Sequence, residues 1–582
     1  MRQPALLLLL PTILFAQGTF TVGGGAGSSN RVGPTSTQPS VPPQPTKPED
    51  LCSVEGQVVN AVTGEPIRRA SLLLMRSDPV PGETGPPTSY STQSNSTGQF
   101  AMKDIEPGKY RLTVNRNGYV PFTYGARGPM QPGTTLSLIR QQHMADLALR
   151  LTPQAVITGR ILDDEGEPVA NARVALQSYR YINGRKQLTS SFLGGANTTN
   201  DVGEYRLFGV APGKYYVSVT PMPVGQMFGV DRSASTGPEE DYVPTYYPGA
   251  VDASAASQLD VPAGGQLNGI DLILSKGRTV HVKGHITHGL SGRQNLSIFL
   301  TPRNPGAMMG PMRNNQVDAA GNFDIRHVTP GQYYLTVGLN EGGMSRQARV
   351  PVDVGGSNVE GLNIVIGPGI TVKGYLRAEG DSATVDLSNV RLNLQPRESG
   401  GIMFGPIGQG KPNADGLFEI SSVAADRYNL FVSGLPSGAY VKAIRSDQVD
   451  VLASGLDITS GASPADIEIV ISPKAAAVTG VAQNPNTGNP MPGAMVVLIP
   501  QDQQRKEQPT YYKFIASDQN GAFSLTGLTP GEYKAYAWED IEIGAYMDPD
   551  FMKPIEEKGE AVSLQEGEQK TLTLKVIPVV PL

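Results

Sequence analysis

The chain has little of what catalytic, metal-binding and disulfide-stabilised proteins depend on. Its 582 residues include one cysteine, one tryptophan and five histidines. Cys52 has no second cysteine to pair with, so stability must come from hydrophobic cores, and we expect a structural role for this small side chain at the start of a strand. The net charge is only −6 and the basic residues are scattered, which excludes the basic stripe of a nucleic-acid-binding protein.

Long hydrophobic runs are also missing, with one short exception at the start. Met1 and Arg2 precede the apolar stretch 5–16, which is too short to span a bilayer. This pattern is typical of a secretory signal peptide, predicted over residues 1–17. No later segment approaches ~18 apolar residues, so we expect no transmembrane segment in the mature chain. The predicted location is the periplasm, the outer surface or the secreted fraction.

Residues 18–50 consist mainly of glycine, serine, threonine, proline and glutamine. Such a composition cannot bury enough apolar surface to fold. It predicts a disordered linker between the signal peptide and the folded part of the chain.

One pattern recurs five times along the rest of the chain. An Asn or Asp is followed three residues later by Gly, two further on by Phe or Tyr, and a Tyr comes twelve residues after the Gly. The copies are Asn95/Gly98/Phe100/Tyr110, Asn200/Gly203/Tyr205/Tyr215, Asp318/Gly321/Phe323/Tyr333, Asn413/Gly416/Phe418/Tyr428 and Asp518/Gly521/Phe523/Tyr533. A fixed internal spacing indicates one folded unit, repeated.

Apolar residues alternate with period two around each copy, as in strands with one buried face. The Asx-x-x-Gly step predicts a hairpin loop, and Pro-Gly pairs such as Pro107-Gly108 predict the next turn, in which Gly takes positive φ. We therefore interpret each copy as a β-hairpin followed by a returning strand. The aromatic residue two positions after the Gly should be buried, because it shares parity with aliphatic neighbours.

Each unit also opens and closes with an alternating strand. The opening strand carries a core-facing glycine, first Gly56, which we expect to leave room for a bulky neighbour from the opposite sheet. The pattern predicts an all-β chain, a tandem array of five β-sandwich domains. Their predicted boundaries are 51–152, 153–275, 276–367, 368–473 and 474–582.

Three of these units resemble a known family. "VEGQVVNAVTGEPIRRASLLL", "ITGRILDDEGEPVANARVAL" and "VTGVAQNPNTGNPMPGAMVVL", with the repeat segments that follow them, resemble carboxypeptidase regulatory-like domains. The resemblance covers roughly residues 53–577 and is weakest in the third and fourth units. It implies seven-stranded, prealbumin-like Greek-key sandwiches, akin to collagen-adhesin B-type repeats. It also implies a non-catalytic accessory or adhesive role. The relationship of this fold to carbohydrate-binding folds further suggests that the protein binds carbohydrate.

No catalytic, cofactor or metal site is predicted. His281 and His285 would lie ~13 Å apart on one strand with His288 on the other face, whereas zinc needs donors ~2 Å from one point; we expect solvated strand-edge histidines. The segment 405–411 imitates a phosphate-binding loop, but Pro412 stands where Ser or Thr should hold magnesium. The five Asx turns lack the second carboxylate that calcium would need.

Two aromatic and acidic segments are the candidate ligand-binding sites. Aromatic faces with nearby carboxylates commonly bind sugar rings. The alternative is that these segments fold back over the sandwiches or join neighbouring units. The candidate residues are Trp538, Glu539, Asp540, Tyr546 and Asp548 in the fifth unit, and Tyr242, Tyr246 and Tyr247 after the second.

The sequence thus favours an exported, non-catalytic cell-envelope protein. It would act as a structural or adhesive spacer, with saccharides or cell-envelope proteins as partners. The alternative is an accessory subunit of an extracellular hydrolase or of an outer-membrane uptake system. An unrecognised enzyme is a third hypothesis, disfavoured because the sequence shows no acid–base constellation.

Overall fold

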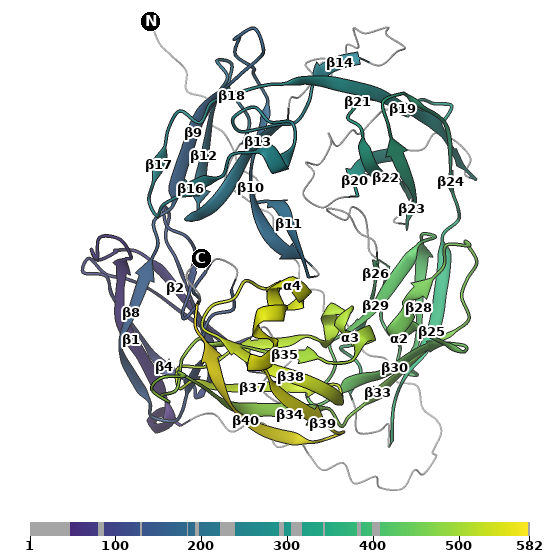
Figure 1. Cartoon of the computed structure of the whole chain (residues 1–582). Coiled ribbons are helices and arrows are strands. Elements are labelled where there is room, and N and C mark those ends of the chain that lie inside the picture. Colours follow the sequence, from purple (N-terminus) through teal and green to yellow (C-terminus); the bar gives the residue numbers. More distant parts are fainter. Residues whose placement is uncertain are drawn as a thin grey trace, which may run out of the picture. The chain divides into compact units, whose positions relative to one another are not determined.

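Strands make up nearly all of the regular structure in the computed structural model of the chain (Figure 1). It describes residues 47–78, 87–128, 131–182, 184–191, 197–220, 239–289, 296–303, 317–341, 344–380, 386–397 and 408–579. The predicted signal peptide and nearly all of the predicted linker lie outside these ranges, as do residues 405–407 of the segment that imitates a phosphate-binding loop.

The helices of these ranges are single turns. They are η1 (Pro48–Asp50), η2 (Ala253–Ala255), α2 (Val451–Ser454), α3 (Gln503–Lys506), η4 (Pro509–Tyr511), η5 (Ala545–Met547), α4 (Pro549–Met552) and η6 (Lys553–Lys558). None of these helices has the length and apolar character that crossing a membrane requires.

The first sandwich sets the order of strands for the others. It contains β1 (Cys52–Asn60), β2 (Ser71–Arg76), β3 (Ser89–Gln93), β4 (Gln99–Ile105), β5 (Gly108–Asn115), β6 (Phe122–Thr123), β7 (Leu136–Leu138) and β8 (His143–Leu151). One sheet has the order β4-β1-β8, and the other has β3-β2-β5 with β6 and β7 on β5. The opening strand β1 pairs antiparallel with β4 and parallel with the closing strand β8.

The second and third sandwiches repeat this order. The second contains β9 (Ala155–Leu162), β10 (Arg173–Ile182), β11 (Arg185–Ser190), β12 (Glu204–Val210), β13 (Gly213–Thr220), β15 (Thr245–Tyr246), β16 (Leu259–Val261), β17 (Gln266–Leu267) and β18 (Leu272–Ile273). The third contains β19 (Lys276–His288), β20 (Leu296–Pro302), β21 (Asn322–Val328), β22 (Gly331–Glu341), β23 (Met344–Val354) and β24 (Val359–Ile366), and β14 (Glu239–Tyr242) pairs with β19. In both, the opening strand pairs in parallel with the closing segment.

The last two sandwiches keep the parallel pairing of the opening and closing strands, but their sheets are joined differently. The fourth contains β25 (Ile370–Ala378), β26 (Arg391–Pro396), β27 (Gln409–Gly410), β28 (Leu417–Val423), β29 (Arg427–Ser433), β30 (Tyr440–Ser446), β31 (Val449–Asp450), β32 (Leu456–Asp457) and β33 (Ile467–Ser472). The fifth contains β34 (Ala476–Gln483), β35 (Met495–Pro500), β36 (Lys513–Ala516), β37 (Ala522–Leu528), β38 (Gly531–Trp538), β39 (Glu560–Leu564) and β40 (Gln569–Ile577). The parallel pairs here are β25–β33 and β34–β40.

The apolar cores follow the repeat. Buried side chains form separate clusters within residues 52–151, 155–274, 280–366, 370–471 and 476–576. The aromatic residues predicted to anchor these cores, Phe100, Tyr205, Phe323, Phe418 and Phe523, are all buried, which confirms that prediction. The all-β architecture is confirmed too, whereas the domain boundaries stay a prediction.

The Asx side chain makes the same two bonds in every copy. In the fourth sandwich, the Asn413 Oδ1 atom accepts the backbone N–H of Asp415 at 3.0 Å and of Leu417 at 2.9 Å. Asn95, Asn200, Asp318 and Asp518 make the equivalent bonds. The glycine of each copy has φ between 72° and 90°, which a side chain would disfavour. Turn chemistry therefore accounts for these positions.

The hairpin interpretation was wrong, because the strands before and after the Asx turn do not pair with each other. In the first sandwich, β3 belongs to one sheet and β4 belongs to the other. The Pro-Gly turn crosses back, from β4 to β5. Gly213 and Gly531 have the positive φ predicted for this turn (155° and 149°), whereas Gly108 and Gly331 do not. Alternation shows only that one face of a strand is buried. Strands of both sheets of a sandwich meet this condition, so alternation cannot tell which sheet a strand belongs to.

The expected role of the core-facing glycine also needs correction, because its bulky neighbour comes from the same sheet. Gly480 pairs directly with Phe523, and Gly56, Gly159, Gly284 and Gly374 pair with the corresponding aromatic residue. A Cβ atom at these glycines would lie 2.0–2.3 Å from a carbonyl oxygen of the closing strand. The glycine thus allows both the ring and the closing strand to approach the opening strand.

A further repeated position has no consistent residue type. The residue six before the repeat tyrosine is left-handed in every copy: Asp104, Gly209, His327, Ser422 and Gly527, with φ between 55° and 76°. It lies beside the shift in register where β4, β12, β21, β28 and β37 leave the opening strand. Of these five residues only the two glycines are of a type that favours positive φ, so only they could have indicated the bulge in the sequence.

Candidate functional site

The aromatic candidates of the fifth sandwich are buried. Trp538 is the last residue of β38 and is 3% exposed; its ring stacks on Tyr536 with 5.1 Å between centroids. Tyr546 is 4% exposed and lies 6.0 Å from the ring of Tyr512. Burial raises the pKa of Tyr546 to about 12, so its hydroxyl stays protonated near neutral pH. In this conformation neither ring offers a free face to a ligand.

The segment that follows β38 covers these rings. Its turns η5, α4 and η6 lie over the second face of the strands β35 and β38, where a second apolar cluster of this sandwich forms. The cluster contains Met495, Val497, Ile499, Tyr512, Tyr536, Trp538, Ile541, Ala545, Tyr546 and Ile577. The Asp548 side chain caps α4 by accepting the N–H of Asp550 at 2.9 Å. The Tyr536 hydroxyl donates to the Glu556 carbonyl at 3.0 Å, which holds η6 in place.

The two acidic candidates of this segment are bonded to the first sandwich. The Arg127 Nη1 atom lies 3.1 Å from Glu539 Oε1, and the Gln131 Nε2 atom donates to Asp540 Oδ1 at 2.6 Å. Nearby, Gln519 exchanges two hydrogen bonds with the backbone of Ser137, at 2.7 and 2.9 Å. These polar groups thus join sandwiches, which is the alternative that the sequence left open. No sequence signal linked them, because the partners lie about four hundred positions apart.

The three tyrosines predicted to follow the second repeat pack within or against the second sandwich, in or beside short strands. Tyr242 ends β14, and its hydroxyl donates to the Asp164 carboxylate. The Lys276 Nζ atom lies 2.8 Å from Asp164 Oδ2 and 5.3 Å from the Tyr242 ring centroid. These bonds hold the pKa of Asp164 below its usual range. Tyr246 is buried in β15, and Tyr247 packs against the core of the second sandwich.

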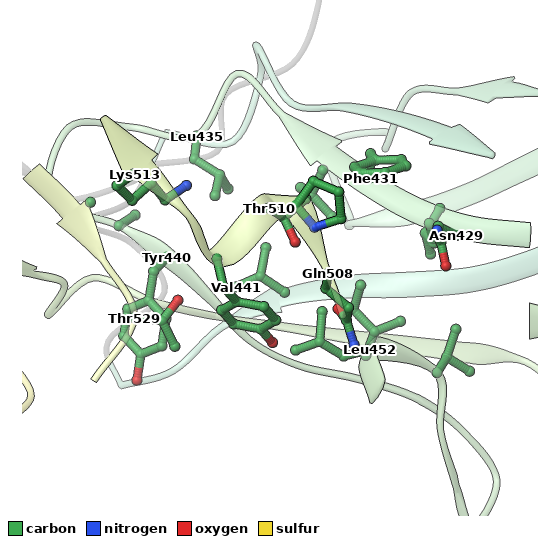
Figure 2. A pocket seen from close by; sticks show the side chains of 18 residues that line it. Asn429, Phe431, Leu435, Tyr440, Val441, Leu452, Gln508, Thr510, Lys513 and Thr529 are labelled. Carbon is green, nitrogen blue, oxygen red and sulfur yellow. The ribbon is translucent and has the colours of Figure 1, made fainter. Parts of the chain in front are cut away.

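A cavity of about 210 Å³ lies where the fourth sandwich meets the fifth (Figure 2). Strands β29 and β30 and helix α2 supply one wall, and η4, β36, the end of β37 and the turn after it supply the other. The walls are mainly apolar and aromatic, with Phe431, Leu435, Val441 and Tyr511 among them. Lys513 is the only residue of the lining that carries a charge at neutral pH. Nothing in the sequence pattern identified this cavity.

Burial shifts the titration of the groups in this cavity. The pKa of the Lys513 amine is lowered, because its surroundings disfavour the charged form. The pKa of Tyr440 is raised to about 12 by burial and by the hydrogen bond that its hydroxyl donates to Glu566 at 2.7 Å. Burial also raises the pKa of Tyr511. Both phenols are therefore neutral hydrogen-bonding groups rather than bases.

The histidines do not converge on a metal site. His281 is buried and its Nδ1 atom lies 2.9 Å from Asp324 Oδ1, so the expectation of a solvated strand-edge histidine was wrong there. His285 is solvent-exposed as expected and bonds Asn322 at 3.0 Å, but β19 is not an edge strand there, because it pairs with both β21 and β24. Within the part of the chain that the structure describes, no three His, Cys, Asp or Glu side chains are grouped as metal ligands would be.

Comparisons with known proteins support the family resemblance in the first sandwich. Residues 53–142 match the carboxypeptidase regulatory-like domain. Two human proteins, the BOS complex subunits NOMO3 and NOMO1, are 24% identical to the chain over 254 residues. That alignment covers 41% of the chain and 20% of each relative, so the chain spans about a fifth of the length of these relatives.

Bacterial pilins are among the solved structures that align with the chain. The minor pilin GBS52 of Streptococcus agalactiae aligns with 39% of the chain and 96% of its own, at 10% identity and a TM-score of 0.21. The major pilin subunit BcpA of Bacillus cereus aligns with 72% of the chain and 99% of its own, at 10% identity and a TM-score of 0.15.

Proposed function

We propose that the protein is a non-catalytic, load-bearing component of the cell envelope, in which five sandwiches in series form a structural or adhesive spacer. The observation that carries this proposal is the pairing of the first and last strands in every sandwich. In the first, β1 runs parallel to β8 from Ser53 opposite His143 to Asn60 opposite Leu151. In the fifth, β34 runs parallel to β40 from Ala477 opposite Gln569 to Gln483 opposite Lys575.

Parallel terminal strands determine how a sandwich responds to a pull along the chain. Force enters at the start of the opening strand and leaves at the end of the closing strand. Because these strands point the same way, the pull slides one past the other and loads all the hydrogen bonds between them together. In a peeling geometry the same bonds would break one after another. Forced unfolding is governed by the unfolding rate, which simultaneous loading of the bonds keeps low.

The repeated residues leave little room for a catalytic function in the sandwiches. The Asx side chain and its glycine form a turn, the aromatic residue fills the core, and the core-facing glycine admits the closing strand. The repeat tyrosine bonds the carbonyl four residues earlier in four copies, at 2.7–3.0 Å. Each position that recurs thus has a structural task.

Export belongs to the same proposal and rests on the sequence of residues 1–17, which lie outside the described ranges. The location would be the periplasm, the outer surface or the secreted fraction. An accessory subunit of an extracellular hydrolase or an outer-membrane uptake system would need the same spacer, with cell-envelope proteins as partners.

Single-molecule pulling from the two ends of the chain tests the load-bearing role. We expect five separate unfolding events, each releasing about 30 nm, as ~90 residues extend by ~3.5 Å each. A matched peeling experiment pulls the fifth sandwich through cysteines at Asn486 and Val579, with Cys52→Ala to remove the natural thiol. Both attachment points then lie at one end of the β34–β40 pair, and the sandwich should yield at a clearly lower force. Equal forces in the two geometries would contradict the proposal.

Saccharide binding is a second candidate function. It is favoured by the half-buried Tyr242 ring, which lies beside the Asp164 carboxylate and the Lys276 amine. A saccharide site formed by the residues from Trp538 to Asp548 stays a prediction. Binding there would require the segment after β38 to open, because that segment buries the rings of Trp538 and Tyr546.

A glycan array probed with the full chain measures this activity. We expect weak binding that Tyr242→Ala removes, since the ring supplies the apolar face for the sugar. Tyr375→Ala is the control, because Tyr375 is an exposed tyrosine (39%) on the fourth sandwich. Absence of binding, or equal loss in both variants, would count against the site.

A further inference from the structure

We propose that the cavity between the fourth and fifth sandwiches is a binding site for a small carboxylate with an aromatic or branched apolar body. This inference is independent of the load-bearing function. It rests on the shape of the cavity, on how its walls are held and on one amine inside it.

Direct bonds between the two sandwiches hold the walls of the cavity in place. The Tyr440 hydroxyl donates to Glu566 at 2.7 Å, and the Lys442 Nζ atom lies 3.0 Å from the same carboxylate. On the other side of the cavity, the Gln508 Nε2 atom donates to the Ala453 carbonyl at 3.1 Å. The Lys442–Glu566 and Tyr440–Glu566 bonds share one acceptor, so they form a small network rather than isolated surface pairs. The space between the walls is therefore maintained by bonds that do not themselves fill it.

The apolar part of the lining matches the body of such a ligand. Figure 2 shows Phe431, Leu435, Val441 and Leu452 around the cavity, and the Tyr511 side chain also lines it. A volume of about 210 Å³ corresponds to roughly seven water molecules at ~30 Å³ each. That space suits a ligand of roughly ten non-hydrogen atoms, smaller than the drug-sized molecules that larger pockets accept.

The Lys513 amine determines the charge of the ligand. Lys513 is half-buried in β36, and no hydrogen bond or ion pair of its Nζ atom is found among the described residues. A partly desolvated ammonium without a partner gains from a nearby opposite charge, and a carboxylate beside it would supply that charge. The hydroxyls of Thr510 and Thr529 also line the cavity and can donate to the second carboxylate oxygen.

The same lining disfavours other classes of ligand. With a single cationic residue among the side chains that line the cavity, a dianion such as phosphate would leave one charge uncompensated. A neutral apolar molecule would leave the amine unpaired, and a cation would be repelled by it. Burial lowers the pKa of Lys513, in keeping with a lining that contains no acidic residue.

Benzoate and phenylacetate are suitable probes, with benzyl alcohol as the neutral counterpart of similar size. Titration calorimetry of the full chain should show saturable binding of the carboxylates, at least about tenfold tighter than binding of the alcohol, which corresponds to ~1.4 kcal/mol. Lys513→Met should weaken the carboxylates about tenfold, because it keeps the length of the side chain and removes the charge. Lys575→Met is the control, since Lys575 is exposed on β40 outside the cavity.

A second variant and a folding measurement keep the result interpretable. Leu435→Trp should fill the cavity and abolish binding of both probes. Lys513→Met should melt no lower than the natural chain, because it removes a partly buried charge without a partner, so lost binding would not reflect unfolding. Unchanged benzoate affinity in Lys513→Met or in Leu435→Trp overturns the proposal, as does the absence of saturable carboxylate binding to the natural chain.

Discussion

Replacing Gly480 with alanine is expected to unfold the fifth sandwich at temperatures at which the other sandwiches stay folded. The added Cβ atom would lie 2.0 Å from the Leu572 carbonyl oxygen and 2.8 Å from the Phe523 Cζ atom. Strand β34 lies between β37 and β40, so it cannot relieve one contact without worsening the other. We expect a loss of about 3 kcal/mol in the unfolding free energy of this sandwich, at the upper end of overpacking effects. Calorimetry of the full chain measures it as a downward shift of one transition.

Gly338→Ala is the matched control for that substitution. Gly338 also lies within a strand, β22, but a Cβ atom there would meet no atom within 4 Å. We expect no loss of stability, since alanine restricts the unfolded chain more than glycine does. Equal melting of the Gly480→Ala variant and the natural chain would show that β34 and β40 are not packed as described.

Truncating Phe523 to alanine should destabilise the same sandwich by ~3–5 kcal/mol. The ring is 5% exposed, packs within the core and covers Gly480, so its removal leaves a cavity and uncovers the backbone of β34. Chemical denaturation should show a lower midpoint for one transition, with the remaining transitions unchanged because each sandwich has its own cluster.

Phe208→Ala serves as the comparison for Phe523→Ala. Phe208 is 39% exposed on β12, where its ring lies beneath the Arg206 guanidinium at 5.4 Å. Removing an exposed ring should change the stability by about 0.5 kcal/mol or less. Similar losses in the two variants would contradict the assignment of Phe523 as a core anchor.

Local regularities of the sequence predicted local structure well. The Asx turns, the left-handed glycines after them and the burial of the five aromatic anchors depend on residues within a few positions of each other. Alternation also located the opening and closing strands. Such features are encoded locally because turn geometry and strand parity are properties of short segments.

The same reasoning cannot predict contacts between residues that lie far apart in the chain. Alternation does not tell which sheet a strand joins, so it predicts a hairpin of β3 and β4, which belong to different sheets. The sequence predicts a ligand-binding site at Trp538 and Tyr546, because they are aromatic residues with carboxylates nearby. In the structure, the segment after β38 buries both.

The sequence by itself determined the repeat, the strand-rich class of the fold, the turn chemistry and the identity of the core anchors. Only the tertiary structure decided that the first and last strands of each sandwich run in parallel, that Glu539 and Asp540 bond the first sandwich, and that Lys513 lies in a cavity between two sandwiches. The reason is physical: turns and alternation arise from interactions within a few residues. Sheet order, interfaces and cavities depend on which distant surfaces come together, and no local pattern specifies that.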